Sequence, residues 1–210
     1  MERVRAQDAS DVIATSVDWE DYLQSFAADH AEWVEGTVVR LSPVTRTHNL
    51  LFLYLSNLLS SYLARSGEGQ LLVEPFVMRL PGISAREPDL QVITTPNLGC
   101  LQNTYTDGPA DLVIEIVSPE SDTRDRVEKF SEYERGGVGE YWIIDPLHHE
   151  ALFYQRINGV FVRSTVRENG VYVCAVLPHL RVRVSDLWRA PLPTPAEIEQ
   201  VVAAMLDSAP

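Results

Sequence analysis

The segment 111–117, with the sequence DLVIEIV, most constrains how this chain can fold. An almost continuous apolar run of this length indicates a central strand that is covered on both faces. A polar stretch with helical spacing follows at 122–135 and ends at Gly136-Gly137, and 139–145 returns to a strand pattern. A strand, a helix and a strand in this order predict a parallel pair with a right-handed crossover. The chain is therefore expected to be an α/β protein.

The rest of the sequence predicts elements around this unit. Apolar spacing and turn residues indicate a short amphipathic helix at 18–28, a hairpin or a strand entered through a turn at 32–41, and a buried helix at 45–65. They also indicate strands at 71–80 and 89–94, an antiparallel meander at 151–184 and a closing helix at 196–206. The turn signals of the meander are Asn158-Gly159 and Asn169-Gly170. We therefore expect a mixed central sheet flanked by helices, with the meander at its C-terminal end.

A chain of 210 residues can form one sizeable core, which favours a single domain. We expect an N-terminal extension over 1–17, the folded domain over 18–188 and a tail with the short helix over 189–210. Serine and asparagine interrupt the apolar run at 49–63, which argues against a bilayer span, and 1–20 has no signal-peptide pattern. Because the two cysteines show no pairing or metal-ligand spacing, a cytoplasmic protein without a membrane partner is expected.

The net charge of −13 at first argues against a polyanionic partner such as nucleic acid. The charge is unevenly distributed, however. Residues 1–36 carry nine acids and two arginines, whereas 146–189 carries six arginines and three acids. A basic surface is therefore compatible with the sequence in the second of these segments.

Glu115 is the residue that most requires an explanation, because it lies inside the apolar strand. An unpaired carboxylate inside a domain costs several kcal/mol, so it needs a salt bridge or a metal ion. Asp89 stands at the start of the strand 89–94 and offers a second carboxylate. If the two strands are neighbours, Asp89 and Glu115 can bind one divalent ion through hard oxygen ligands.

Helical spacing supplies a third partner. Asp125, Lys129 and Tyr133 follow one another at intervals of four, so they form one stripe of the helix that packs against the strand of Glu115. Of 17 cationic residues, Lys129 is the only lysine, which favours a site that needs a compact ammonium rather than a guanidinium. The alternatives are codon bias and an exposed ladder of weak charge pairs, and for the helix alone these are favoured.

Other candidates are weaker. His48 begins the buried helix, where a histidine is more often a capping or hydrogen-bonded residue than a ligand. Glu32 stands at a strand entrance, where an acid is ordinarily solvated. His148 and His149 lack the spacing of a zinc site, and the sequence contains no phosphate-binding loop, nucleophile elbow or HExxH motif.

These residues belong to seven short motifs in a fixed order: Glu32-Trp33-Val34-Glu35-Gly36, Pro43 with His48, Pro88-Asp89, Val113 to Pro119, Asp125 with Lys129 and Tyr133, Gly137-Val138, and Glu140 to Pro146. Together they resemble the bacterial Uma-type family, a group of proposed endonucleases with a restriction-endonuclease-like fold in the PD-(D/E)XK superfamily. The resemblance spans roughly 18–188 and implies that fold for the predicted domain.

The resemblance implies a nuclease that hydrolyses phosphodiester bonds of DNA with Mg²⁺ or Mn²⁺ as cofactor. Asp89 and Glu115 match the two metal ligands of the family. Val117 replaces the usual lysine two residues after the acid, and Lys129 matches a helix lysine that takes over its catalytic role. Glu32 matches an additional carboxylate near the metal, and His48 matches a residue that lines the site. The composition and the resemblance thus select the same lysine independently.

Two further functions remain open. A non-catalytic binding or assembly module on the same fold is favoured by the negative charge and by the missing strand lysine. A two-carboxylate hydrolase of another class, such as a glycosidase, would have no use for Lys129. The oligomeric state is open as well, and a homodimer is one of the alternatives.

Overall fold

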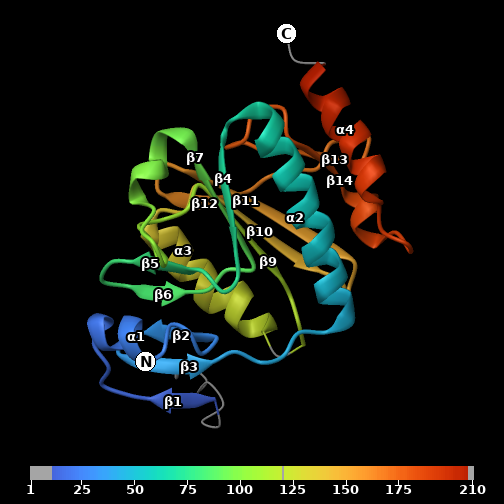
Figure 1. Cartoon of the computed structure of the whole chain (residues 1–210). Coiled ribbons are helices and arrows are strands. Elements are labelled where there is room, and N and C mark those ends of the chain that lie inside the picture. Colours follow the sequence, from blue (N-terminus) through green and yellow to red (C-terminus); the bar gives the residue numbers. More distant parts are fainter. Residues whose placement is uncertain (1–10, 120, 208–210) are drawn as a thin grey trace.

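The computed structural model describes residues 11–119 and 121–207 (Figure 1). These residues form two large mixed sheets, a small antiparallel sheet and the helices that cover them. The predicted α/β class is confirmed. The central sheet has the strand order β12-β11-β10-β9-β7-β4, in which β9 and β10 run parallel and the other neighbours run antiparallel.

The strands of the central sheet are β4 (Gly69–Val73), β7 (Leu90–Thr94), β9 (Leu112–Ile116), β10 (Glu140–Asp145), β11 (Glu150–Ile157) and β12 (Val160–Arg163). Strand β9 is buried at every position, as its apolar sequence predicts. Its side chains alternate between two apolar cores. Ile114 belongs to the core under the long helix α2 (Arg46–Ser66), and Val113 belongs to the core under α3 (Phe130–Gly136).

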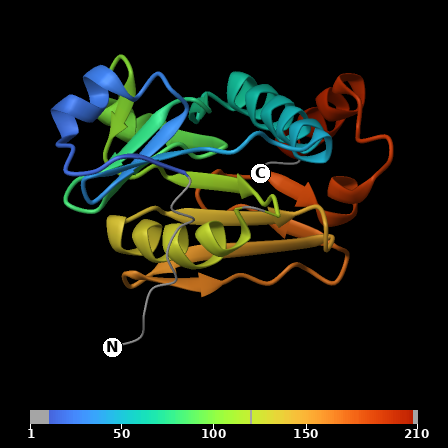
Figure 2. The same cartoon turned by 90° about the horizontal axis from the view of Figure 1, so that it is seen from below.

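The helices cover the central sheet unequally. Helix α2 begins at the predicted cap, since the Thr45 side chain accepts a hydrogen bond from the His48 amide, and it ends at Gly67 in a left-handed conformation. The closing helix α4 (Pro195–Asp207) packs beside α2, and the two lie together on one side of the strands (Figure 2). None of the described helices is long and apolar enough to cross a membrane.

A second sheet packs next to the central one and was not predicted as a separate unit. Its order is β1-β3-β2-β6-β5-β8, and its strands are β1 (Val12–Ala14), β2 (Ala31–Val34), β3 (Thr37–Arg40), β5 (Val77–Leu80), β6 (Ser84–Arg86) and β8 (Tyr105–Asp107). Of the two alternatives for 32–41, the hairpin is confirmed, with β2 and β3 as its strands. Helix α1 (Trp19–Ser25) covers this sheet and is capped by Asp18.

Two sequence predictions about strands are wrong in part. The segment 71–80 is not one strand but two, because Pro75 has no amide hydrogen for a ladder, so β4 and β5 lie in different sheets. The antiparallel meander predicted over 151–184 is confirmed only around Asn158-Gly159, the turn that joins the antiparallel strands β11 and β12. Beyond it, β13 (Val171–Val173) and β14 (Arg181–Arg183) pair with each other in a small sheet of their own.

The division of the chain into an extension, a domain and a tail stays a prediction. Residues 1–10 of the expected extension and 208–210 of the expected tail lie outside the described residues. Within 1–17, β1 pairs with β3 and so joins the second sheet.

A buried carboxylate attaches the small sheet to the central one. Glu140 of β10 is fully buried and accepts hydrogen bonds from five donors, namely Trp142 Nε1, Tyr172 Oη, Cys174 Sγ and the amides of Ala175 and Val176. The ring of Tyr172 stacks on that of Phe153, with centroids 3.8 Å apart. Five donors around one anion satisfy a group that would otherwise be costly to bury.

Replacing Glu140 by Gln should therefore lower the free energy of unfolding by about 2–3 kcal/mol, because the amide is neutral and presents its own NH₂ to groups that also donate. Urea unfolding of Glu140→Gln and of the exposed control Glu20→Gln measures this difference. Equal stability of Glu140→Gln and wild type would contradict the anchoring role of Glu140.

Candidate active site

The register between β7 and β9 brings Asp89 and Glu115 together. Leu90 pairs with Ile114 in the antiparallel ladder, so Asp89, one residue earlier, lies opposite Glu115, one residue later, on the same face of the sheet. The Asp89 Oδ2 atom accepts a 2.6 Å hydrogen bond from the Ile116 amide. The prediction that the two strands are neighbours is confirmed.

Lys129 reaches the Glu115 carboxylate from the helical side. Its Nζ lies 2.8 Å from Glu115 Oε1, 3.1 Å from Glu32 Oε1 and 3.6 Å from Asp125 Oδ1. The Tyr133 hydroxyl donates a second hydrogen bond of 2.8 Å to Glu115 Oε1. Asp125, Lys129 and Tyr133 are all buried, so the alternative of an exposed ladder of charge pairs is wrong.

The local backbone explains how these side chains meet. Residues Arg124–Lys129 form a π-helical turn that continues directly into α3. A π turn is wider than an α turn and often stands at a functional site. The Ser121 hydroxyl donates a 2.5 Å hydrogen bond to Asp125 Oδ2, and the Tyr141 hydroxyl donates one to the Asp125 carbonyl. The start of the helix is thereby fixed against the sheet.

Glu32 lies at the centre of an ion-pair network between the two sheets. Its Oε2 accepts from Arg86 Nη1 at 2.8 Å, and its Oε1 accepts from the Glu87 amide at 3.2 Å in addition to the contact with Lys129. Arg86 also holds Glu132 of α3 through two hydrogen bonds of 2.6 and 2.7 Å. Burial opposes ionisation of Glu32, but Lys129 and Arg86 outweigh it and lower the pKa of this carboxyl. Glu32 therefore carries a negative charge inside the protein.

His48 contacts Asp89 from the first turn of α2. The distance between His48 Nε2 and Asp89 Oδ2 is 3.1 Å, and the other ring nitrogen, Nδ1, is buried and has no hydrogen-bond partner among the described residues. Burial opposes protonation of the ring, but the hydrogen bond to Asp89 and the charges of Asp89 and Glu74 raise the pKa of His48. The five residues selected from the sequence are thus joined in one network, either directly or through the neighbouring strand.

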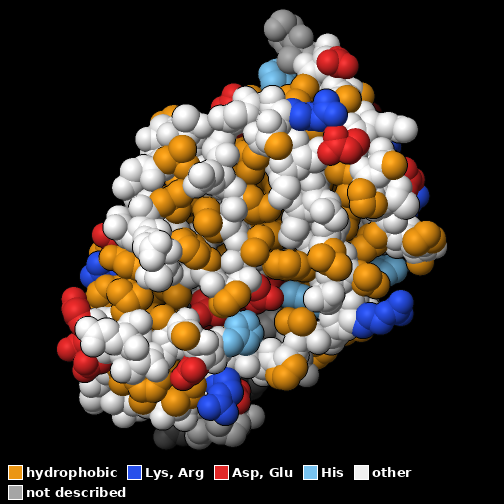
Figure 3. Space-filling model, in the orientation of Figure 1, with side chains coloured by type: hydrophobic (Ala, Val, Ile, Leu, Met, Phe, Trp, Pro, Cys, Tyr) orange, Lys and Arg blue, Asp and Glu red, His pale blue; other side chains and the backbone are white. Residues whose placement is uncertain are grey.

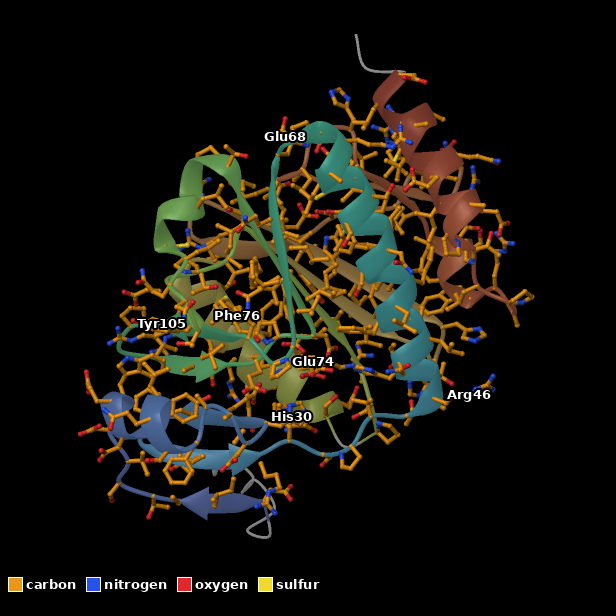
Figure 4. All side chains as sticks on the ribbon, viewed as in Figure 1. His30, Arg46, Glu68, Glu74, Phe76 and Tyr105 are labelled. Carbon is orange, nitrogen blue, oxygen red and sulfur yellow. The ribbon has the colours of Figure 1, made fainter. Side chains whose placement is uncertain are left out.

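Two acids of the site were missed by the sequence analysis. A cavity of about 40 Å³ opens at the junction of the two sheets, and its lining includes Glu74, Glu87, Asp89, Glu115 and Lys129. Figure 3 shows acidic and histidine side chains in a recess between the N-terminal part and the rest of the molecule. Glu74 follows β4, and Figure 4 places it near His30, whose Nδ1 lies 3.2 Å from Glu87 Oε2.

Burial, together with the crowding of acids, raises the pKa values of carboxyl groups at the cavity. Burial, with the charge of Asp89, raises the pKa of Glu74 to about 7, and burial, with the charges of Glu32 and Glu74, raises the pKa of Glu87 to about 8. Burial also raises the pKa of Glu115, and Asp125 and Asp89 add to this effect while Lys129 opposes it. A surplus of carboxylates around one small cavity is the electrostatic environment that a cation relieves.

The donor set of the cavity fits a hard divalent cation. Its lining includes five carboxylates, and two of their oxygens, Glu87 Oε1 and Asp125 Oδ1, are buried without a hydrogen-bond partner in the described part of the chain. No group of three or more His, Cys, Asp or Glu residues among those described is arranged as a ready metal site. A cation here would take its remaining ligands from water and substrate, as Mg²⁺ commonly does with one or two carboxylates.

Comparison with known proteins identifies the family. The profile of the Uma2 family, described as "Putative restriction endonuclease", matches residues 19–185. This chain belongs to the Uma2 family. The resemblance noted in the sequence is therefore confirmed.

A solved structure has the same fold as this Uma2 protein. It is described as a putative nuclease belonging to DUF820 from Anabaena variabilis, and it matches with a TM-score of 0.68 and 17% sequence identity over 80% of this chain and 96% of its own. No protein of curated function matches the sequence.

The raised pKa values predict how the stability of this Uma2 protein depends on pH. In a metal-free buffer the folded protein keeps protons on Glu74 and Glu87 that the unfolded chain, with carboxyl pKa values near 4.5, has already lost. The free energy of unfolding should therefore fall as the pH rises from about 5 to about 8. Replacing Glu87 by Gln should flatten this decrease, as measured by urea unfolding at a series of pH values with EDTA.

The exposed acid Glu35, replaced by Gln, is the control and should keep the slope of wild type. Added Mn²⁺ should stabilise the wild type more at pH 8 than at pH 5.5, because the carboxylates then bind it without first losing protons. A stability that rises between pH 5 and pH 8 without metal would contradict the crowding of acids described above.

Proposed function

We propose that this protein is a metal-dependent nuclease that hydrolyses phosphodiester bonds of DNA. The observation that carries the proposal is the position of Lys129. Its buried ammonium lies 2.8 Å from the carboxylate of Glu115, and Asp89 lies opposite Glu115 on the neighbouring strand. Membership of the Uma2 family supports the same class of reaction. A glycosidase, the other hydrolase considered, is disfavoured because its two carboxylates would not need this ammonium.

Asp89 and Glu115 are the residues that would hold Mg²⁺ or Mn²⁺. Both hydrogen bonds to Glu115 go to Oε1, so a metal ion would be bound through Oε2. Such an ion lowers the pKa of bound water and stabilises charge on the phosphoryl oxygens. Glu74 and Glu87 line the same cavity and would bind its water ligands.

Lys129 would act as a charged donor rather than as a base. Burial favours the neutral amine, but Glu115, Glu32 and Asp125 outweigh it and raise the pKa of Lys129 far above its ordinary value. The ammonium therefore stays protonated at neutral pH. It can orient the attacking water or donate a hydrogen bond to a phosphoryl oxygen on which negative charge develops.

Glu32 and His48 would be positioning residues. Both carboxylate oxygens of Glu32 already accept hydrogen bonds or face Lys129, so this acid would hold the lysine and Arg86 in place rather than bind the metal. His48 would orient Asp89 through its Nε2. Tyr133 would keep Glu115 Oε1 occupied and so direct Oε2 toward the cavity.

Metal binding provides the first test. Isothermal titration of metal-free protein with Mn²⁺ should give one site on wild type and at least a tenfold weaker site on Asp89→Asn, because the amide keeps the shape of Asp89 but loses the charge. The variant Asp186→Asn, outside the acidic cavity, should bind like wild type. Equal binding by Asp89→Asn and wild type would contradict the ligand role of Asp89.

Cleavage provides the second test. Plasmid nicking and degradation of single-stranded DNA with Mg²⁺ and with Mn²⁺ should fall about 10²- to 10⁴-fold in both Lys129→Met and Lys129→Arg. Methionine removes the charge. Arginine keeps it, but the larger planar guanidinium does not fit a buried point between three carboxylates.

Arg135→Lys, on the same helix, is the control that should remain active, and thermal melting shows whether each variant is folded. Undiminished cleavage by Lys129→Arg would contradict the role given to the lysine. If folded wild type cleaves no DNA with either metal, the alternative of a non-catalytic binding or assembly module, favoured by Val117 in place of the strand lysine, replaces this proposal.

A further inference from the structure

A groove of about 610 Å³ opens beside the acidic cavity, and both involve the first turn of α2. His48 lines the acidic cavity, whereas Arg46 and Leu50 line the groove. Figure 4 shows Arg46 at the start of α2, where it projects outward. Pro146 lines the groove and directly follows β10, which runs parallel to the strand of Glu115 and ends at the same edge of the sheet. The groove therefore begins within about one helical turn of the candidate site.

The lining of this groove is apolar and aromatic although it is open to solvent. The indole of Trp188 stacks on the ring of His149 with centroids 5.2 Å apart and an angle of 12° between the planes. Leu50 and Leu53 of α2 are 42% and 50% exposed. A stacked aromatic pair next to exposed leucines offers a planar apolar surface of the kind on which nucleic-acid bases stack.

Two further cavities, of about 170 and 360 Å³, adjoin this groove, since Tyr54 lines all three, and both reach α2 at Tyr54 and Leu58. The last of them is lined by Arg167, Arg181 and Arg183. Arg181 and Arg183 alternate along β14 with Val182, whose side chain is buried in the core, so both guanidinium groups lie on the outer face. The arginines supply the basic surface that the sequence left unassigned.

These arginines are available to bind an anion. Among residues 11–119 and 121–207, none of the three side chains forms an ion pair, and Asp186 is the one acid that lines their cavity. Three guanidinium groups and one carboxylate leave a local positive charge on a protein whose net charge is −13. Guanidinium groups bind phosphate with matching geometry.

We propose that this groove, together with the two cavities that adjoin it, binds a single strand of the nucleic-acid substrate, with bases against Trp188 in the groove and phosphates on Arg167, Arg181 and Arg183 in the last cavity. The inference rests on the proposed function and specifies that the nucleic-acid substrate is single-stranded. From Arg46 to Leu58 the helix α2 rises about 18 Å, which matches about five stacked nucleotides of one strand. A single strand fits better than a duplex, because the faces of paired bases are hidden in their own stack and are not free for Trp188.

The experiment measures binding separately from cleavage. Fluorescence anisotropy of a labelled 12-nucleotide single strand, and of the same sequence as a duplex, is followed with EDTA, so that no metal-dependent cleavage occurs. Wild type should bind the single strand at least tenfold more tightly than the duplex. Arg181→Ala with Arg183→Ala should weaken single-strand binding about tenfold and lower the slope of log K against log salt by about 1.4, since each lost phosphate contact contributes about 0.7.

Two matched controls isolate the groove. Arg40→Ala with Arg163→Ala removes the same charge from exposed positions on β3 and β12 and should leave affinity and slope unchanged. Trp188→Leu keeps apolar bulk without a ring and should lose about tenfold in affinity, whereas Trp188→Phe keeps an aromatic ring and should lose less than Trp188→Leu. Thermal melting confirms that each variant is folded.

The outcomes separate this inference from the proposed function. If wild type prefers the duplex or binds no single strand, or if either the double arginine variant or Trp188→Leu binds like wild type, the groove proposal is overturned even where DNA is cleaved. If the groove variants lose affinity but wild type cleaves nothing with Mg²⁺ or Mn²⁺, the groove proposal stands and the nuclease proposal fails.

Discussion

The contact between Lys129 and the carboxylate of Glu115 is the interaction on which the arrangement of the two sheets around the site depends. It joins the central strand β9 to the helical segment that precedes α3, and through Glu32 it reaches β2 of the second sheet. A charge on Glu115 in so apolar a strand would be costly without this ammonium. The same group that stabilises the buried acid therefore also fixes the distance between the sheets at the site.

The positive charge of the cluster does not balance its acids. The cations of the cluster are Lys129, Arg86 and Arg124, the last of which also lines the small cavity. They are fewer than the carboxylates, and the side-chain hydrogen bonds of Arg86 go to Glu32 and Glu132, away from that cavity. The surplus of acid remains where Glu74, Glu87, Asp89 and Glu115 converge. Three of these acids, Glu74, Glu87 and Glu115, have raised pKa values, so the metal-free protein holds protons where a cation would otherwise neutralise charge.

The sequence predicted the parts of the site that depend on local periodicity. An acid inside an apolar strand, and Asp125, Lys129 and Tyr133 at intervals of four, are visible without a structure. Glu74 and Glu87 were missed because their position depends on chain reversals between the two sheets, which separate β4 from β5 and bring β6 back beside β2. The only local sign was their place next to Pro75 and Pro88. The second sheet itself was missed for the same reason, since its strands are short and distant in sequence.

The contrast between Arg86 and Lys129 explains why this arginine-rich chain contains a lysine. Arg86 is fully buried, and its planar guanidinium holds Glu32 on one side and Glu132 on the other, a geometry that an ammonium does not reproduce. Lys129, in the same network, lines the cavity and presents a single point charge between three carboxylates. Arginine thus stands where a fixed fork joins structural elements, and lysine stands where a compact cation faces a small acidic cavity.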